Sequence, residues 1–225
     1  MRLLLLALLV LTVASTAAHA AASPGALSDA EFVALCRGAE HREHCGRLVE
    51  AEILKRHPGL AQRQDRRLAV RLNGGALREF LDREGSADGK LPDRAVSIWA
   101  YDPRNDFVTL WVQEGERSNY LITNRETGLT VEMPAEPVGS PDHLRFAVAD
   151  FCEQHCRNEL TLWEVQIHRL RRARTLAPTP AWVDAEVRWK DRHTLAIEAK
   201  RIGPAGPSMN YFEIDLGDAR WKFDD

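Results

Sequence analysis

The most informative segment of this sequence is Pro137-Val138-Gly139-Ser140-Pro141-Asp142-His143-Leu144-Arg145-Phe146-Ala147-Val148-Ala149-Asp150. Its Ser-Pro-Asp part has turn chemistry, because proline pre-sets φ to about −65° and an aspartate side chain can bond the backbone two residues further on. After the turn, Leu144, Phe146 and Val148 occupy every second position. This period of two predicts a strand with one buried face.

The same order of strand, polar turn and strand recurs at residues 187–199. Asn73-Gly74-Gly75 is a strong hairpin signal between the alternating segments 68–72 and 76–81. Residues 107–113 carry large apolar side chains on both faces, which predicts a central strand. The recurrence suggests β-repeats of roughly 40–45 residues, the size of a propeller blade.

At these residues the chain resembles a known group. The segment "SPDHLRFAVAD" is similar to the S-P-D-G blade motif of TolB-like β-propellers, with His143 in the place of the usual glycine. Residues 68–200 further resemble a group of uncharacterised secreted bacterial proteins. The segments that carry this resemblance are Tyr120 to Gly128, Ser140 to Ala149, Leu160 to Val165 and Ala185 to Trp189. The resemblance implies a blade-type β-fold and no particular activity.

About three blade-like units and a partial first pair can be counted, whereas most closed propellers have roughly 4–8 blades. We therefore expect a mainly β fold: an open, curved, propeller-like array of antiparallel blades with an N-terminal helical pair covering one edge. Residues 61–67 are expected to be a polar connector and 83–94 a loop. Residues 210–216 and 220–223 are expected to form a closing hairpin across 217–218.

The helical pair is predicted from capping and periodicity. Ser28 and Glu31 have the spacing of a capping box. A second helical pattern ends at His57-Pro58-Gly59. The expected organisation is a leader over 1–20, a helical segment over 21–60 and a β-repeat domain over 61–225, with the helices and repeats in one globular unit.

The first twenty residues have the composition of a secretory signal peptide. Arg2 precedes an apolar run that is too short to span a bilayer, and small residues follow up to Ala20. The expected location is therefore the periplasm or the exterior, with no membrane-spanning segment. Without Arg2 the chain has 33 acidic residues and one fewer than its 30 basic ones. This mild acidity argues against nucleic acid as a partner.

The four cysteines are Cys36, Cys45, Cys152 and Cys156. An even number in an exported protein indicates two disulfides. Three connectivities are possible. The local pairs Cys36–Cys45 and Cys152–Cys156 are favoured, and a crossed pairing that would join the helices to the β-part stays open.

Motifs of hydrolases, phosphate-binding loops and zinc proteases are missing from the sequence. The alternative chemistry is a zinc or copper site, built from His41, His44 and His155 if the two Cys/His segments met in space with free thiolates. In an oxidising compartment disulfides with solvated histidines are favoured over this site. No cofactor is predicted.

The leading interpretation is a non-enzymatic secreted protein that binds an envelope protein or another macromolecule. Candidate contact residues are the basic group Arg169, Arg171, Arg172 and Arg174 and the tryptophan expected to be most exposed, Trp182. For the four arginines a solvated turn is the favoured interpretation, and contact with an anionic partner is the alternative. A third interpretation is an inhibitor of a cell-wall hydrolase that acts through the loop Arg83 to Arg94.

Overall fold

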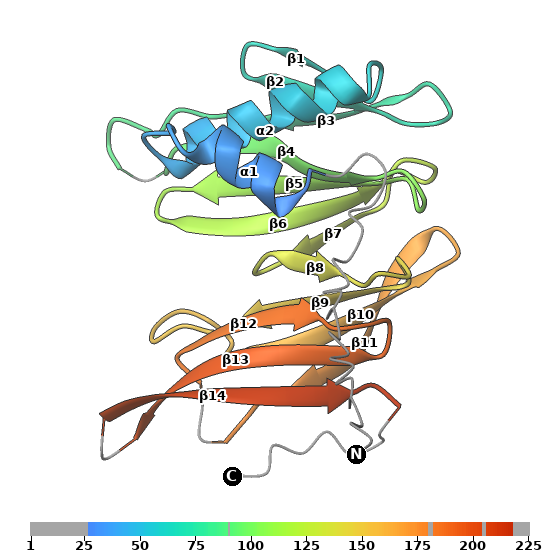
Figure 1. Ribbon diagram of the computed structural model, residues 1–225. Coiled ribbons are helices and arrows are strands. Elements are labelled where there is room, and N and C mark those ends of the chain that lie inside the picture. Colours follow the sequence, from blue (N-terminus) through green and yellow to red (C-terminus); the bar gives the residue numbers. More distant parts are fainter. Residues whose placement is uncertain (1–26, 90, 180–181, 204–205, 218–225) are drawn as a thin grey trace, which may run out of the picture.

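The computed structural model describes residues 27–89, 91–179, 182–203 and 206–217, and within them the chain is mainly β (Figure 1). The helices are α1 (Asp29–Cys36) and α2 (Arg42–Arg56). The strands are β1 (Ala61–Gln64), β2 (Arg67–Arg71), β3 (Leu77–Leu81), β4 (Arg94–Asp102), β5 (Phe107–Glu114), β6 (Arg117–Asn124), β7 (Thr130–Met133), β8 (Pro137–Gly139), β9 (Arg145–Asp150), β10 (Glu159–Gln166), β11 (Arg169–Leu176), β12 (Asp184–Trp189), β13 (Thr194–Gly203) and β14 (Gly206–Asp215).

These strands form four antiparallel sheets, and within each sheet consecutive strands are neighbours. The strand orders are β1-β2-β3, β4-β5-β6-β7, β8-β9-β10-β11 and β12-β13-β14. Figure 1 shows the first two sheets in the upper part of the molecule, with α1 and α2 beside them, and the last two sheets together in the lower part. Residues of these last two sheets share one hydrophobic cluster. The predicted β class with two N-terminal helices is confirmed.

The prediction that residues 107–113 form a central strand is also confirmed. β5 lies between β4 and β6, and Phe107, Val108, Leu110 and Trp111 are buried. A strand that reads as apolar on both faces is stable only when both faces are covered. Here these side chains belong to the larger of two hydrophobic clusters, which α2 also joins through Val49 and Ile53.

The helices begin and join as the sequence indicates. The Ser28 side chain accepts a hydrogen bond from the Glu31 amide, and the Glu31 carboxylate accepts one from the Ser28 amide. Cys36 at the end of α1 is bonded to Cys45 in the first turn of α2. The second disulfide joins Cys152 to Cys156, so the structure has the favoured local pairing.

The Ser-Pro-Asp turn forms between β8 and β9 as predicted. The Ser140 amide donates to the carbonyl of Arg145, and the Asp142 carboxylate accepts from the Leu144 amide at 3.1 Å. His143 has a φ of 62°, the left-handed conformation that glycine adopts at least cost. The turn thus keeps its usual backbone form with a histidine at the glycine position.

Two segments differ from the expectation. Residues 61–67 were expected to be a connector, but β1 pairs with β2 over Ala61–Gln64. Arg63 occupies an inward position and donates a hydrogen bond to Glu50. Because this inward residue is charged and not apolar, the sequence of β1 lacks the alternation of apolar and polar residues that predicts a strand. Residues 169–174 were expected to be a turn, but they lie in β11, the outer strand of its sheet. Charged residues are common on such outer strands because they discourage edge-to-edge association.

The last strand of the described chain is β14, which pairs with β13, with Gly203 opposite Gly206. The expected hairpin partner of β14, residues 220–223, lies outside the described residues, as does the expected leader.

Candidate functional site

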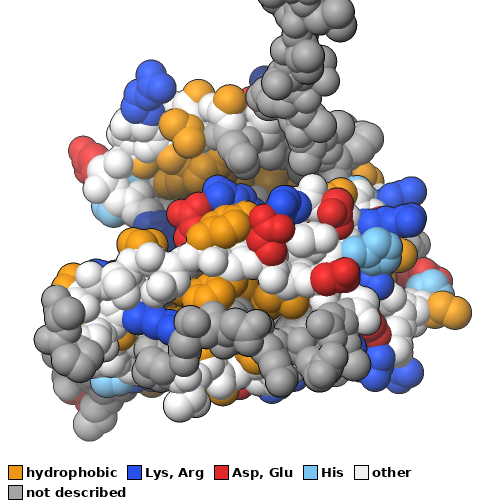
Figure 2. All heavy atoms as spheres, turned by 60° about the horizontal axis from the view of Figure 1, so that its bottom comes forward, with side chains coloured by type: hydrophobic (Ala, Val, Ile, Leu, Met, Phe, Trp, Pro, Cys, Tyr) orange, Lys and Arg blue, Asp and Glu red, His pale blue; other side chains and the backbone are white. Residues whose placement is uncertain are grey.

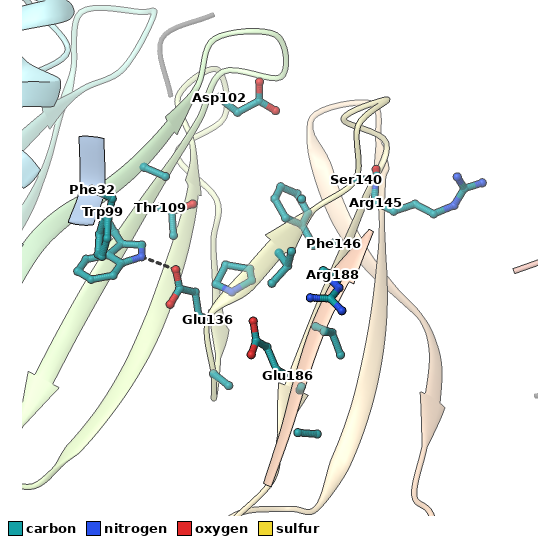
Figure 3. Close-up of a pocket in the computed structure, with 18 of the residues that line it drawn as sticks. Phe32, Trp99, Asp102, Thr109, Glu136, Ser140, Arg145, Phe146, Glu186 and Arg188 are labelled. Carbon is teal, nitrogen blue, oxygen red and sulfur yellow. Dashed lines mark hydrogen bonds between the residues drawn. The ribbon is translucent and has the colours of Figure 1, made fainter. Parts of the chain in front are cut away.

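The main hollow of the molecule is a cleft of about 1060 Å³ between the second sheet on one side and β8, β9 and β12 on the other. Figure 2 shows hydrophobic side chains inside a hollow of the surface, with acidic and basic side chains along its rim. Figure 3 shows the interior of the cleft, into which Trp99, Glu136, Phe146, Glu186 and Arg188 contribute side chains. The size falls at the upper end of the range of roughly 300–1,000 Å³ that is usual for ligand sites.

A β-bulge places Trp99 in the wall of the cleft. The register between β4 and β5 shifts between Ile98 and Ala100, which leaves Trp99 without an opposite residue. Bulges turn a side chain away from the regular alternation and are frequent beside functional sites. The indole contacts the ring of Phe32 from α1 edge to face, with 4.9 Å between ring centroids.

Glu136, in the connection between β7 and β8, is fixed by three neighbours. Its carboxylate accepts hydrogen bonds from Trp99 Nε1 at 2.7 Å and from the Tyr120 hydroxyl at 3.2 Å. Arg42 donates to the Tyr120 hydroxyl at 2.8 Å and lies 3.8 Å from Glu136. Burial raises the pKa of Tyr120 well above its usual range, and the charge of Glu136 adds to this effect. Tyr120 therefore remains a neutral donor, while the half-exposed Glu136 keeps a defined position at the cleft.

The opposite wall is formed by the exposed face of β12. Val187 is buried below this strand, and Asp184, Glu186 and Arg188 are exposed. Arg188 pairs with Glu198 at 2.6 Å, whereas Asp184 and Glu186 form no ion pair with any described residue. Figure 3 shows the Glu136 carboxylate turned toward Trp99, and the Glu186 carboxylate extending from β12 toward the segment that carries Glu136. The arrangement offers carboxylate acceptors beside an aromatic wall, which suits a ligand with cationic or hydrogen-bond donor groups.

Ser140, Asp102 and His143 meet at one end of the cleft without forming a nucleophile. Asp102 lies 3.1 Å from His143 Nδ1, which resembles part of a catalytic triad. The Ser140 hydroxyl, however, donates to Asp142 at 2.5 Å and accepts from the Arg145 amide. Both bonds hold the turn, so Ser140 serves the backbone and not the chemistry of a hydrolase.

The structure does not bring the residues of the alternative metal site together. His41 Nδ1 accepts a hydrogen bond from the His44 amide at 3.1 Å and caps α2. His155 lies in the loop closed by the second disulfide. All four cysteines are paired in the two disulfides, so none offers a free thiolate. Across the described part of the chain, no group of three or more His, Cys, Asp or Glu side chains could hold a metal ion.

Of the predicted contact residues, the four arginines are exposed and the tryptophan is buried. Arg169, Arg171, Arg172 and Arg174 are exposed along β11, where Arg171 pairs with Glu164 at 2.6 Å and Arg172 lies over the ring of Trp163. The expectation that Trp182 is exposed was wrong, because its side chain is fully buried in the second hydrophobic cluster. It stacks on Phe212 with 5.3 Å between ring centroids. Proximity to prolines indicated exposure, but the indole of Trp182 packs in the core.

In comparisons with known proteins, no family model matches this sequence, and no curated protein matches it significantly. The resemblance to TolB-like repeats therefore stays a prediction. Among the described residues, no helix is both long and apolar enough to cross a membrane.

Sequence reasoning missed the cleft residues Trp99, Glu136 and Glu186. Glu186 lies on β12, where side chains alternate between the two faces. The strand that the sequence predicts over residues 185–189 therefore indicated that Glu186 is exposed. The bulge at Trp99 and the contact between Arg42 and Glu136 join segments far apart in the sequence and left no local signal.

Proposed function

We propose that this protein is a non-enzymatic, extracytoplasmic binding protein that receives its partner in the cleft between the second sheet and β12. The observation that carries the proposal is a cleft of about 1060 Å³ with an aromatic wall and two carboxylates, Glu136 and Glu186, among its lining residues. The partner would be an envelope protein or another macromolecule that presents a cationic or donor-rich segment. Two disulfides support a location outside the cytoplasm.

The succession of three- and four-stranded antiparallel meanders supports the further proposal of a propeller-like arrangement related to TolB-like blades. In such folds, grooves between neighbouring sheets and their connecting loops are natural places for ligands. The cleft lies at such a junction, where Trp189 Nε1 donates to the Val138 carbonyl and holds β12 beside β8.

Site-directed photocrosslinking in the intact envelope tests this proposal. A photoreactive amino acid at Asp184, in the cleft, is expected to give an adduct of one defined mass. The same residue at Arg78, exposed on β3, is the control and is expected to give none. Adding Glu186→Lys should weaken the Asp184 adduct without changing the melting temperature, because Glu186 makes no described ion pair. Equal adducts from both positions, or none from Asp184, would refute the cleft as the binding site.

A further inference from the structure

One end of the stacked sheets carries exposed aliphatic residues at three turns. Leu129 follows the β6–β7 turn, Leu144 ends the β8–β9 turn and Ile167 lies at the tip of the β10–β11 hairpin. Their relative exposures are 57%, 52% and 84%. Figure 1 shows the β10–β11 hairpin projecting from the stack at this end.

Hydrogen bonds join these turns into one surface. The Val165 amide, just before the hairpin tip, donates to the Leu144 carbonyl at 2.9 Å. On the other side of the tip, His168 Nδ1 lies 2.6 Å from the Glu126 carboxylate of the β6–β7 turn. A hollow of about 240 Å³ lies between Leu129 and His168. The three aliphatic residues therefore belong to a single exposed area, here called the turn surface.

Local turn chemistry does not account for Ile167. Gln166 and Arg169 are the last pair of the hairpin, so Ile167 and His168 form its two-residue loop. The left-handed position of this loop, which favours glycine or asparagine, is occupied by His168 with a φ of 60°, and the position of Ile167 is open to most residue types. A β-branched aliphatic residue there neither eases the turn nor buries itself. Single exposed aliphatic residues are ordinary, but three on adjoining turns form a patch that indicates an interaction.

Arginines surround this patch. Arg169 begins β11, Arg104 donates to the Asp142 carbonyl at 3.3 Å, and the Arg192 carbonyl accepts from Arg145 at 3.2 Å. Within the described chain, the guanidinium groups of Arg104, Arg169 and Arg192 form no ion pair with a carboxylate. Five described acidic residues at these turns are engaged locally: Asp102 with His143, Asp106 with Arg125, Asp142 with Arg145, Glu126 with His168, and Asp191 with the amides of His193 and Thr194.

We propose that the turn surface binds peripherally to a lipid bilayer that contains anionic headgroups. Ile167, Leu129 and Leu144 would enter the boundary between headgroups and acyl chains, as apolar residues of interfacial proteins do. The unpaired guanidinium groups would meet the lipid phosphates, with which arginine forms planar, paired hydrogen bonds. The protein then lies on the membrane, an orientation independent of what the cleft binds.

The experiment is vesicle sedimentation of the exported protein, purified after secretion and with its N-terminus determined by mass spectrometry. Vesicles of phosphatidylcholine with one third phosphatidylglycerol are compared with pure phosphatidylcholine vesicles. Ile167→Asn should lower the partition coefficient about tenfold, because one fully inserted aliphatic side chain contributes at least this factor. The matched control is Ile202→Asn. Ile202 is 55% exposed near the tip of the β13–β14 hairpin, at the opposite end of the sheets, and its replacement should leave partitioning unchanged.

The arginine contribution is measured separately. Combined Arg104→Gln and Arg169→Gln should lower binding to anionic vesicles about 25-fold, since each arginine near such a surface contributes about fivefold. Binding that is equal on neutral vesicles, or equally reduced by both isoleucine replacements, would overturn the proposal. Absence of sedimentation with anionic vesicles at low salt would overturn it as well. Melting temperatures of the variants verify that each is folded.

Discussion

The Ile98 amide donates a hydrogen bond to the buried Glu50 carboxylate at 3.0 Å, which connects α2 to the outer edge of β4. The Val96 amide on the same edge donates to Asp82 at 2.8 Å. Arg63 bonds both carboxylates and the Val96 carbonyl. At Val96 and Ile98, the edge of β4 that faces away from β5 is thus satisfied by side chains, whereas Arg94 at the start of β4 pairs with the backbone of Arg83. Unpaired strand edges otherwise promote association.

Glu50→Ala should reduce the free energy of unfolding by about 3–5 kcal/mol, because it leaves the Arg63 charge and the Ile98 amide buried without this acceptor. Glu52→Ala, two positions further along α2, is the control, and its effect should be much smaller since its pairs with Lys55 and Arg56 are at the surface. Urea unfolding at neutral pH measures both. Equal losses in the two variants would show that the Glu50 network contributes little.

Removing the disulfide between α1 and α2 by Cys36→Ala with Cys45→Ala should cost about 2–3 kcal/mol on the chain-entropy model. The pair Cys152→Ala with Cys156→Ala closes a shorter loop, so its removal should cost less, about 2 kcal/mol. Urea unfolding without reductant compares the two variants with the parent. A larger loss of stability in the Cys152→Ala/Cys156→Ala variant than in the Cys36→Ala/Cys45→Ala variant would contradict the chain-entropy model.

The conformation at His143 can be isolated by two replacements that both lose the imidazole. At a φ of 62°, His143→Ala places a Cβ in the left-handed region and His143→Gly does not. The glycine variant should therefore be more stable than the alanine variant by about 1 kcal/mol. Thermal unfolding of the pair measures this difference. A more stable alanine variant would mean that the turn adopts another conformation in solution.

Acid should weaken the capping box of α1. Hydrogen bonds from Arg56, and then from Ser28, lower the pKa of Glu31 from 4.5 to about 2. A carboxyl group whose pKa is lower in the folded state stabilises the fold above its unfolded pKa, and this contribution is lost as the pH falls from 4.5 to about 2. Glu31→Gln should therefore show a smaller loss of stability over this range than the parent protein.

Chemical unfolding at several pH values checks this prediction. Glu116→Gln, in the β5–β6 turn, is the control, because Glu116 makes no ion pair with the described residues. Its pH dependence should match that of the parent. If Glu31→Gln also matches the parent, the capping box does not contribute in solution.

Local signals in the sequence were sufficient for most elements and for both disulfides. Hairpins with turn residues, such as Asn73-Gly74-Gly75, and the box at Ser28 depend on neighbours a few positions apart. Elements were missed where a charge replaced the expected apolar residue. Arg63 in β1 is inward-facing but bonds Glu50, and the arginines of β11 hid the half-buried Leu170 between them.

The candidate site could not be predicted because its geometry depends on contacts between distant segments. Glu136 is held by Trp99, Tyr120 and Arg42, which come from different elements. Trp182 shows the converse error, since its neighbours in the sequence indicated a loop and its burial depends on Phe151 and Phe212.

The side-chain cover of β4 has a consequence for the boundaries of the folding unit. A chain that starts at residue 61 would keep all fourteen strands but would lose Glu50 and Arg47, and the amide of Ile98 would face solvent. Such a truncated chain should self-associate through this strand instead of remaining monomeric. While α2 is in place, Arg47 and Glu50 occupy the edge of β4 at Val96 and Ile98, and no additional strand can join the second sheet there.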